Sequence, residues 1–309
     1  GRPVNESNLH HRESLIRIVQ RAKEIAGGNG AVGVNILYCI NDYGRVVKDA
    51  VDAGADLIIT GAGIPLNLPE FAGDGDVALV PIVSSARVLK IICKKWLHRY
   101  GRLPDAVVVE GPKSGGHQGF TVEQCEDTRY TLENIFPEVV KEAREWGDFP
   151  LIPAGGIWDR KDIEKYIAMG AAGVQMATRF IGTVECDAAE AFKTLFLTTR
   201  ESDIELMKSP VGYPARGVHT HLQDAMMNGS APTVKCISNC IAPCNRGEKS
   251  KQVGYCIADR LSDAQRGDRD HGLFFSGSNG WRINELVHVR DLIRELTRET
   301  PVPSEALSR

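Results

Sequence analysis

The sequence predicts an α/β fold in which buried strands alternate with amphipathic helices. Six short runs are almost continuously apolar, as strands are when both faces of a parallel sheet are covered. Between them lie segments whose apolar residues recur at helical spacing, and glycines gather after the runs. Repeated strand–helix units of this kind build either a doubly wound sheet or a barrel. The chain has 309 residues, 42% of them hydrophobic, enough for one large domain with an appendage or for two small domains.

The predicted elements follow one another in regular alternation. The first helix ends before Gly27 and Gly28, and its apolar face repeats at i, i+3, i+4, i+7 and i+10. That face consists of Leu15, Ile18, Val19, Ala22 and Ile25. The strands are expected at 31–37, 56–61, 78–83, 106–111, 150–156 and 173–180. The later helices are expected at about 43–53, 86–99, 129–146, 160–169 and 187–199.

Two features favour the barrel over the doubly wound sheet. No strand is followed by the GxGxxG turn and distal acidic residue of a dinucleotide-binding fold. The last two strands end in PAGGIWD and QMATRF, where small residues leave backbone N–H groups available, and barrels commonly bind phosphate after their seventh and eighth strands. Gly155 and Gly156 could simply turn the chain into the next helix. Thr178 and Arg179 stand one strand–helix unit later, at the end of the next predicted strand. The two sites together favour phosphate binding.

Composition and charge exclude several classes of partner. The formal net charge is -3 and no Lys/Arg block is sustained, so neither nucleic acid nor an anionic membrane surface is an expected partner. No apolar run approaches the roughly 18 to 20 residues of a membrane span. The first residues, GRPVNESNLHHRE, lack the apolar core of a signal peptide, and a cytoplasmic protein is expected.

Four of the eight cysteines cluster in the stretch KCISNCIAPCNRGEKSKQVGYC. Cys236, Cys240 and Cys244 are four residues apart, with Cys256 twelve further on, and four thiols could hold zinc or an iron–sulfur cluster. The spacing is not the common CxxC knuckle, and Pro243 interrupts any long helix. We therefore predict buried, reduced thiols and no bound metal.

The stretch VVVEGPKSGGHQGF, from Val107 to Phe120, carries the most informative histidine. It begins as a buried strand and ends with His117 beside glycines that remove the neighbouring side chains. An imidazole titrates near neutral pH and suits proton transfer to or from carbon. The alternative is that His117 caps the following segment.

Five motifs in order carry a resemblance to a known family. They are EGPKSGGHQGF, PAGGIWDRKDIEKYIAMGAAGVQMATRF, TVECDA, SPVGYPARG and GLFFSGSNGWRINELVHV. Together they resemble the nitronate monooxygenases, formerly called 2-nitropropane dioxygenases, and the related flavin-dependent enoyl-acyl-carrier-protein reductases. The resemblance implies an FMN-binding TIM (β/α)8-type barrel with a lid, acting on a small molecule. The family chemistry calls for no metal.

The resemblance also implies a division of the chain. The strand ending in Gly33, Val34 and Asn35 resembles the family's third, so this chain is expected to lack the first two barrel strands. Residues 1–200 would form the barrel, 201–270 a lid with the cysteine cluster, and 271–309 a C-terminal segment and helix returning to the barrel.

Family motifs imply roles for individual residues. His117 would be the general acid or base. Cofactor contacts are expected from Asn35, Glu110, Gly115, Gly116, Ala154, Gly155, Gly156, Gln175, Met176, Ala177 and Thr178. Substrate-side residues would be Gly61, Ala62, Gly63 and Ser84. Asn35 and Gln175 could instead satisfy backbone groups, Glu110 could be a satisfied acid at the rim, and the loop at 60–63 could only form a turn. Lys113 could contact an anionic substrate or remain a solvated charge.

The expected function is FMN-dependent oxidation of alkyl nitronates by molecular oxygen to a carbonyl compound and nitrite. The alternative within the same scaffold is an enoyl-acyl-carrier-protein reductase that uses FMN and NAD(P)H. A third reading is a truncated, inactive barrel that serves only as a binding module. NAD(P)H and a second copy of the chain stay open as partners.

Overall fold

The computed structural model describes residues 4–230, 240–241, 244 and 255–297, which fall into two compact units. Unit 1 is drawn from Gly1–Glu110, Asp127–Ile152 and Cys236–Asn245. Unit 2 is drawn from Gly111–Glu126, Pro153–Lys235 and Arg246–Arg309. The chain therefore enters unit 2 after residues 110, 152 and 245, and it returns to unit 1 at residues 127 and 236.

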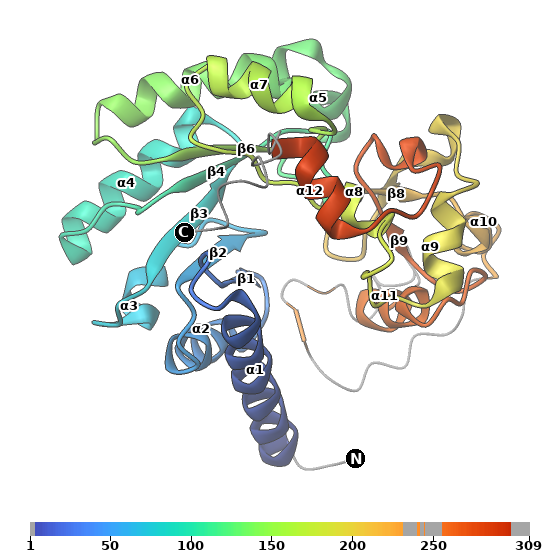
Figure 1. The fold of residues 1–309 in the computed structure, drawn as a ribbon, viewed down its shortest axis with the longest axis horizontal. Coiled ribbons are helices and arrows are strands. Elements are labelled where there is room, and N and C mark those ends of the chain that lie inside the picture. Colours follow the sequence, from blue (N-terminus) through green and yellow to red (C-terminus); the bar gives the residue numbers. More distant parts are fainter. Residues whose placement is uncertain (1–3, 231–239, 242–243, 245–254, 298–309) are drawn as a thin grey trace, which may run out of the picture. The chain divides into compact units, whose positions relative to one another are not determined.

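A five-stranded sheet organises unit 1, in the order β1-β2-β3-β4-β6 (Figure 1). The strands are β1 (Gly33–Leu37), β2 (Leu57–Gly61), β3 (Ala78–Val83), β4 (Val107–Glu110) and β6 (Leu151–Ala154). The pairs from β1 to β4 are parallel. These strands confirm five of the predicted runs and the α/β class, whereas closure into a barrel stays a prediction.

Four of the described helices of unit 1 match predicted ones, whereas the short helix at Leu68–Ala72 was not expected. They are α1 (Val4–Ala26), α2 (Tyr43–Asp52), α3 (Leu68–Ala72), α4 (Ala86–Tyr100) and α6 (Leu132–Arg144), with a 3-10 turn η1 (Thr128–Tyr130). At the start of α4, Ser85 Oγ accepts a hydrogen bond from the backbone N–H of Val88, and Gly101 ends the helix in the left-handed conformation. Helices α4 and α6 lie side by side and fully bury Trp96 and Phe136 (Figure 1).

Two expectations about the strands are wrong. At 173–180 only Gln175 extends the parallel pattern, as a single bridge to Ala154, and the chain then enters helix α8 (Thr178–Ile181). The reason is the backbone at Ala177, whose φ of -131° and ψ of -56° leave the extended region. In addition, β1 is not covered on both faces, because Gly33, Asn35 and Leu37 are exposed in alternation.

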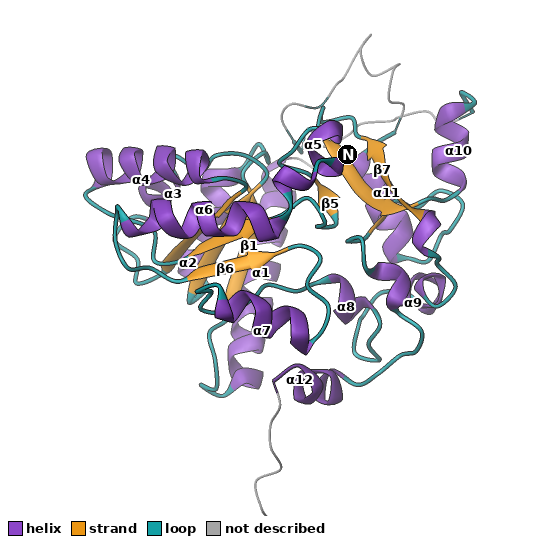
Figure 2. Ribbon diagram, turned by 90° about the horizontal axis from the view of Figure 1, so that it is seen from above, coloured by secondary structure: helices purple, strands orange, loops and turns teal. Residues whose placement is uncertain are grey.

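Unit 2 contains a small antiparallel sheet that the sequence did not predict (Figure 2). Its strands are β5 (Gly116–His117), β7 (Ile204–Lys208), β8 (Pro214–Val218) and β9 (Phe274–Phe275), with β8 pairing all three others. Its helices are α5 (Val122–Glu126), α7 (Arg160–Ala168), α8, α9 (Glu190–Phe196), α10 (His221–Met227), α11 (Ile257–Gln265) and α12 (Val289–Thr297), with 3-10 turns η2 (Glu201–Asp203) and η4 (Gly280–Arg282). The core of unit 2 gathers Trp158, Phe196, Val218, Phe274 and Ile283.

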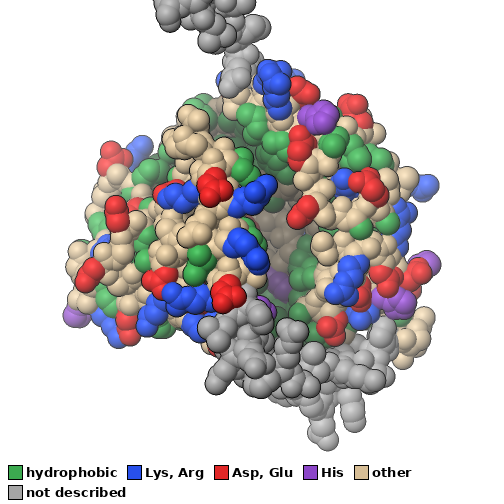
Figure 3. All heavy atoms as spheres, turned by 60° about the horizontal axis from the view of Figure 1, so that its bottom comes forward, with side chains coloured by type: hydrophobic (Ala, Val, Ile, Leu, Met, Phe, Trp, Pro, Cys, Tyr) green, Lys and Arg blue, Asp and Glu red, His purple; other side chains and the backbone are tan. Residues whose placement is uncertain are grey.

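The surface agrees with the modest net charge of the chain. Lysine and arginine alternate with aspartate and glutamate over the face seen in Figure 3. Within the described ranges, no helix has both the length and the apolar character needed to cross a bilayer. The division of the chain at residues 200 and 270 stays a prediction.

Candidate active site

His117 lies on strand β5, which pairs with β8 so that His117 faces Ala215. Its Nε2 is 2.7 Å from Ser209 Oγ, and its ring meets the edge of Phe275 with centroids 5.4 Å apart. Burial lowers the pKa of His117, so the imidazole is predominantly neutral at pH 7. Its Nδ1 has no hydrogen-bond partner among the described residues. A neutral imidazole with one nitrogen engaged and one open can accept a proton.

Ser209 is itself held in place. It is buried between β7 and β8, and its Oγ accepts from the backbone N–H of Val211 at 3.4 Å. Tyr255 lies close to Ser209 and donates its hydroxyl to the carbonyl oxygen of Lys208 at 3.2 Å. Burial raises the pKa of Tyr255, which keeps this phenol protonated. The sequence indicated the SPVGYPARG motif but assigned no role to Ser209 or Tyr255.

Glycines let three loops of unit 2 approach one another closely. A Cβ on Gly115 would come within 2.6 Å of the Ser276 carbonyl carbon, so the space beside Gly115 is filled by backbone. Gly155 has φ +93°, and a Cβ there would lie 2.9 Å from Gly111 O. Gly156 has φ +82° and packs against the Lys113 side chain. Side chains at 115 and 155 would force the neighbouring backbone apart.

The loop at 276–280 ties these segments together. The Gly277 N–H donates to Thr178 Oγ1 at 2.9 Å, and Asn279 Nδ2 donates to Gly156 O at 2.7 Å. The backbone N–H of Ser278 donates to Lys113 O at 3.1 Å. This loop was missed as part of the site, although its run of small residues, SGSNG, was a usable signal.

The loops offer donors for an anionic group. The backbone N–H groups of Gly156 and Ala177 donate to no other residue in the part of the chain that the structure describes. The hydroxyl of Thr178, which follows Ala177, lies against the loop at 276–280. Backbone N–H groups around glycines in left-handed conformations form concave sites for phosphate. The residues present therefore fit the phosphate of a nucleotide-like cofactor.

Unit 2 holds His117 together with most of the predicted cofactor residues. They are Gly115, Gly116, Ala154, Gly155, Gly156, Gln175, Met176, Ala177 and Thr178. The N–H of Gln175 donates to Pro153 O at 2.9 Å, which anchors the segment leading to Thr178 beside β6. The glycine loops and the Thr178 segment thus converge within one unit.

The other predicted residues belong to unit 1, most of them at the carboxyl ends of its parallel strands. They are Asn35, Gly61, Ala62, Gly63, Ser84 and Glu110. Ala62 has a φ of +56°, unusual for a residue with a Cβ, and a Cβ on Gly63 would collide with the Tyr38 ring. Burial raises the pKa of Glu110 to about 7. A carboxyl that titrates near neutrality at such an edge marks a place where function is often found.

The cysteine cluster gives no metal site in the part of the chain that can be described. Cys236 lies outside the described residues, Cys240 belongs to unit 1 and Cys256 to unit 2. The expectation of buried thiols is wrong for Cys244, which is exposed, while Cys240 and Cys256 are only partly buried. Among the described residues, no three His, Cys, Asp or Glu side chains are grouped to hold a metal ion.

The sequence matches one family model over almost its whole length. The family model for nitronate monooxygenase matches residues 2–299, and the chain belongs to this family. A probable nitronate monooxygenase from Staphylococcus aureus (strain Newman) is 30% identical over 123 residues, which are 40% of this chain and 34% of the relative. This chain thus matches about a third of that relative's length.

Solved structures share the α/β architecture. FabK from Thermotoga maritima superposes with a TM-score of 0.73 at 22% identity, over 93% of this chain and 80% of that one. A nitroalkane oxidase from Streptomyces ansochromogenes gives 0.66 at 18% identity, over 93% and 85%. The enoyl reductase domain of MlnA from Bacillus amyloliquefaciens gives 0.62 at 13% identity, over 92% and 80%. These likenesses confirm the predicted fold class at the level of a TIM-barrel-like α/β fold.

Proposed function

We propose that this protein is an FMN-dependent enzyme that oxidises alkyl nitronates with molecular oxygen to a carbonyl compound and nitrite. The observation that carries the proposal is His117, a half-buried imidazole with a lowered pKa beside the glycine loops of a nitronate monooxygenase family member. The five parallel strands would be part of a TIM-type barrel, with a lid at 201–270 and a closing segment at 271–309.

Unit 2 would hold FMN through its phosphate group. Gly156, Ala177 and Thr178 would bind the phosphate, whose charge suits their backbone N–H groups and hydroxyl. FMN supplies the redox chemistry when bound. The remaining predicted cofactor contacts, Asn35 and Glu110 among them, would meet its polar groups. Gly61, Ala62, Gly63 and Ser84 would face the substrate.

His117 would remove the α-proton when the substrate is a neutral nitroalkane. In the tautomer that supports this step, Nε2–H donates to Ser209 Oγ and Nδ1 accepts the proton. The pKa of His117, lowered by burial, keeps Nδ1 unprotonated at neutral pH. Ser209 would fix the ring orientation as a positioning residue. A preformed nitronate has already lost this proton and does not need the base.

A second candidate is the NAD(P)H-dependent reduction of an enoyl thioester by FMN. The observation in its favour is the shared fold with the enoyl reductase domain of MlnA, at a TM-score of 0.62. Because the identity is 13%, this likeness concerns the fold and leaves the substrate open.

The two functions separate in one assay series. Purified protein reconstituted with FMN is mixed with propane-2-nitronate in air without NAD(P)H, and nitrite is measured. We expect a yellow protein that releases nitrite. Rapid NADPH oxidation with a crotonyl thioester and no nitrite from the nitronate would replace the proposal by the reductase, and a protein that stays colourless would favour the inactive binding module.

The role of His117 is tested by comparing substrates. His117→Ala should keep the flavin colour and lower turnover of neutral 2-nitropropane by about a hundredfold, within the range for loss of a general base. Turnover of preformed nitronate should change little. His288→Ala, which removes an exposed histidine paired with Glu185, is the matched control. An equal loss on both substrates would contradict the assignment of His117 as a base.

A further inference from the structure

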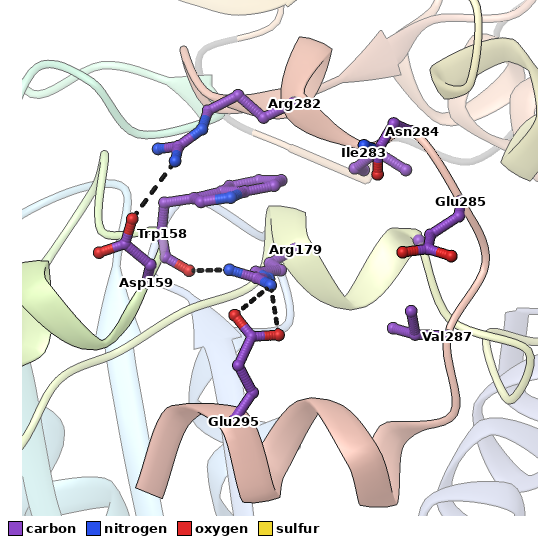
Figure 4. Close-up of a pocket in the computed structure, with 10 residues that line it drawn as sticks. Trp158, Asp159, Arg179, Arg282, Ile283, Asn284, Glu285, Val287 and Glu295 are labelled. Carbon is purple, nitrogen blue, oxygen red and sulfur yellow. Dashed lines mark hydrogen bonds and ion pairs between the residues drawn. The ribbon is translucent and has the colours of Figure 1, made fainter. Parts of the chain in front are cut away.

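Arg179 joins two loops of the proposed phosphate site through a single side chain (Figure 4). Its Nη1 donates to the carbonyl oxygen of Trp158 at 2.7 Å. Its Nη2 donates to both carboxylate oxygens of Glu295 at 2.7 and 2.8 Å. The guanidinium also lies over the Trp158 ring, 5.0 Å from its centroid. A guanidinium can make these contacts at once because its donors form a rigid planar fork.

Trp158 is fixed on its other side as well. The guanidinium of Arg282 lies 5.1 Å from the Trp158 ring centroid and pairs with Asp159 at 3.3 Å. The indole is therefore in contact with two cations, and it is only 6% exposed. Such a residue cannot move without breaking several interactions, so its carbonyl oxygen is a firm anchor for Arg179.

Trp158 and Arg179 stand next to the proposed phosphate-binding residues in the sequence. Trp158 follows Gly156 by two residues, and Arg179 directly follows Thr178. The hydrogen bond between them thus sets the separation of the two loops whose donors would share one phosphate. Hydrogen bonds tolerate a spread of only about half an ångström in length, so a small shift of either loop would cost contacts to the phosphate.

Helix α12 completes the arrangement from a distant part of the sequence. Glu295 orients Arg179, and the neighbouring carbonyl oxygen of Leu296 accepts a hydrogen bond from Arg160 Nη1 at 3.1 Å, which ties α12 to α7. A cavity of about 380 Å³ opens beside this cluster. Water reaches Glu295, which is 55% exposed, whereas Arg179 is only 16% exposed.

We propose that Arg179 is a positioning residue for the cofactor phosphate, and that Glu295 holds its guanidinium in the required orientation. This inference rests on the proposed function, because it assumes that the two loops bind the phosphate of FMN. It predicts that variants at these positions bind FMN more weakly but bind riboflavin, which lacks the phosphate, almost as well as the unmodified protein. A purely structural role would instead weaken the binding of any flavin.

The test measures the dissociation constants of FMN and riboflavin by quenching of flavin fluorescence. Arg179→Lys keeps the charge but loses the fork, and should weaken FMN binding about tenfold, the equivalent of one charge-assisted hydrogen bond. Riboflavin binding should change less than about twofold. Glu295→Gln should show the same selectivity with a smaller loss. Arg294→Lys is the matched control on the same helix, since Arg294 pairs with Asp291.

Two results would overturn the inference while leaving FMN as the cofactor. One is unchanged FMN affinity in both variants. The other is equal weakening of FMN and riboflavin, which would make the cluster structural. Should Arg179→Lys fail to fold, Glu295→Gln decides alone. If the unmodified protein itself does not prefer FMN to riboflavin, the phosphate site proposed above fails, and this inference fails with it.

Discussion

Gly155 and Gly170 allow the cost of one close backbone approach to be measured. Both have similar positive φ values, +93° and +98°, so an added Cβ strains the backbone equally at the two positions. They differ in their surroundings. A Cβ at 155 would lie 2.9 Å from both Gly111 O and Ser114 N, whereas nothing stands within 4 Å of one at 170.

The expected losses follow from these two contributions. Left-handed backbone with a Cβ costs about 1–2 kcal/mol, which is the whole cost for Gly170→Ala. Gly155→Ala adds the cost of overpacking against backbone, about 1–3 kcal/mol, for a total of about 2–5 kcal/mol. The pair of variants therefore separates dihedral strain from steric contact.

Urea unfolding followed by tryptophan fluorescence measures both free energies of unfolding. The midpoints should fall while the dependence on urea stays the same, which keeps the comparison valid. Equal losses for Gly155→Ala and Gly170→Ala would show that the loop at 111–114 relaxes freely. The close packing of the glycine loops would then be no constraint on the fold.

Three further predictions concern single side chains. Ser209→Ala should lower turnover of neutral nitroalkane about tenfold and shift its pH profile, while nitronate turnover stays the same, because only the orientation of His117 is lost; a change on both substrates would contradict this. Burial raises the pKa of Glu110 from 4.5 to about 7, so the protein loses stability as pH rises through this interval. In flavin-free protein, we compare the free energies of unfolding of Glu110→Gln and the parent protein by urea unfolding. From pH 5 to pH 8 the difference should move in favour of the variant by at most about 3 kcal/mol. A difference that does not depend on pH would refute the raised pKa. Asp159→Ala removes the capping box of α7, where Asp159 accepts from the N–H of Asp162, and should cost about 1 kcal/mol. Asp159→Asn should cost less, because asparagine caps equally well, and equal losses would count against the cap.

Much of unit 1 could be predicted because its signals are local. The apolar period of α1 and its end before Gly27 depend only on residues that are near one another in the sequence. The same holds for strands buried by helices, such as β3. The strand expected at 173–180 was wrong because the apolar run there looks the same in the sequence, while the dihedral angles of Ala177 turn the chain into a helix. Two-residue strands such as β5 and β9 are too short to show any period.

The site could be predicted only in part for a related reason. His117 was indicated by its glycine neighbours, which are adjacent in the sequence. Its partner Ser209 is 92 residues away, and a serine carries no signal until folding brings it to the imidazole. The hydrogen bonds between Arg179 and Glu295 join residues that are 116 positions apart in the sequence, and each residue alone resembles an ordinary surface charge.

The distances along the chain also bear on the order of folding. In unit 1 each strand pairs with a strand only a few dozen residues further along the chain, so the sheet can form by closing short loops. The contacts around His117 and Gly156 join residues 92 and 123 apart, and closing such long loops costs more chain entropy before any contact is gained. We therefore expect the sheet to form early and the proposed active site to be assembled last. Slowed folding would then leave molecules that have native-like helices and strands but lack the proposed flavin site.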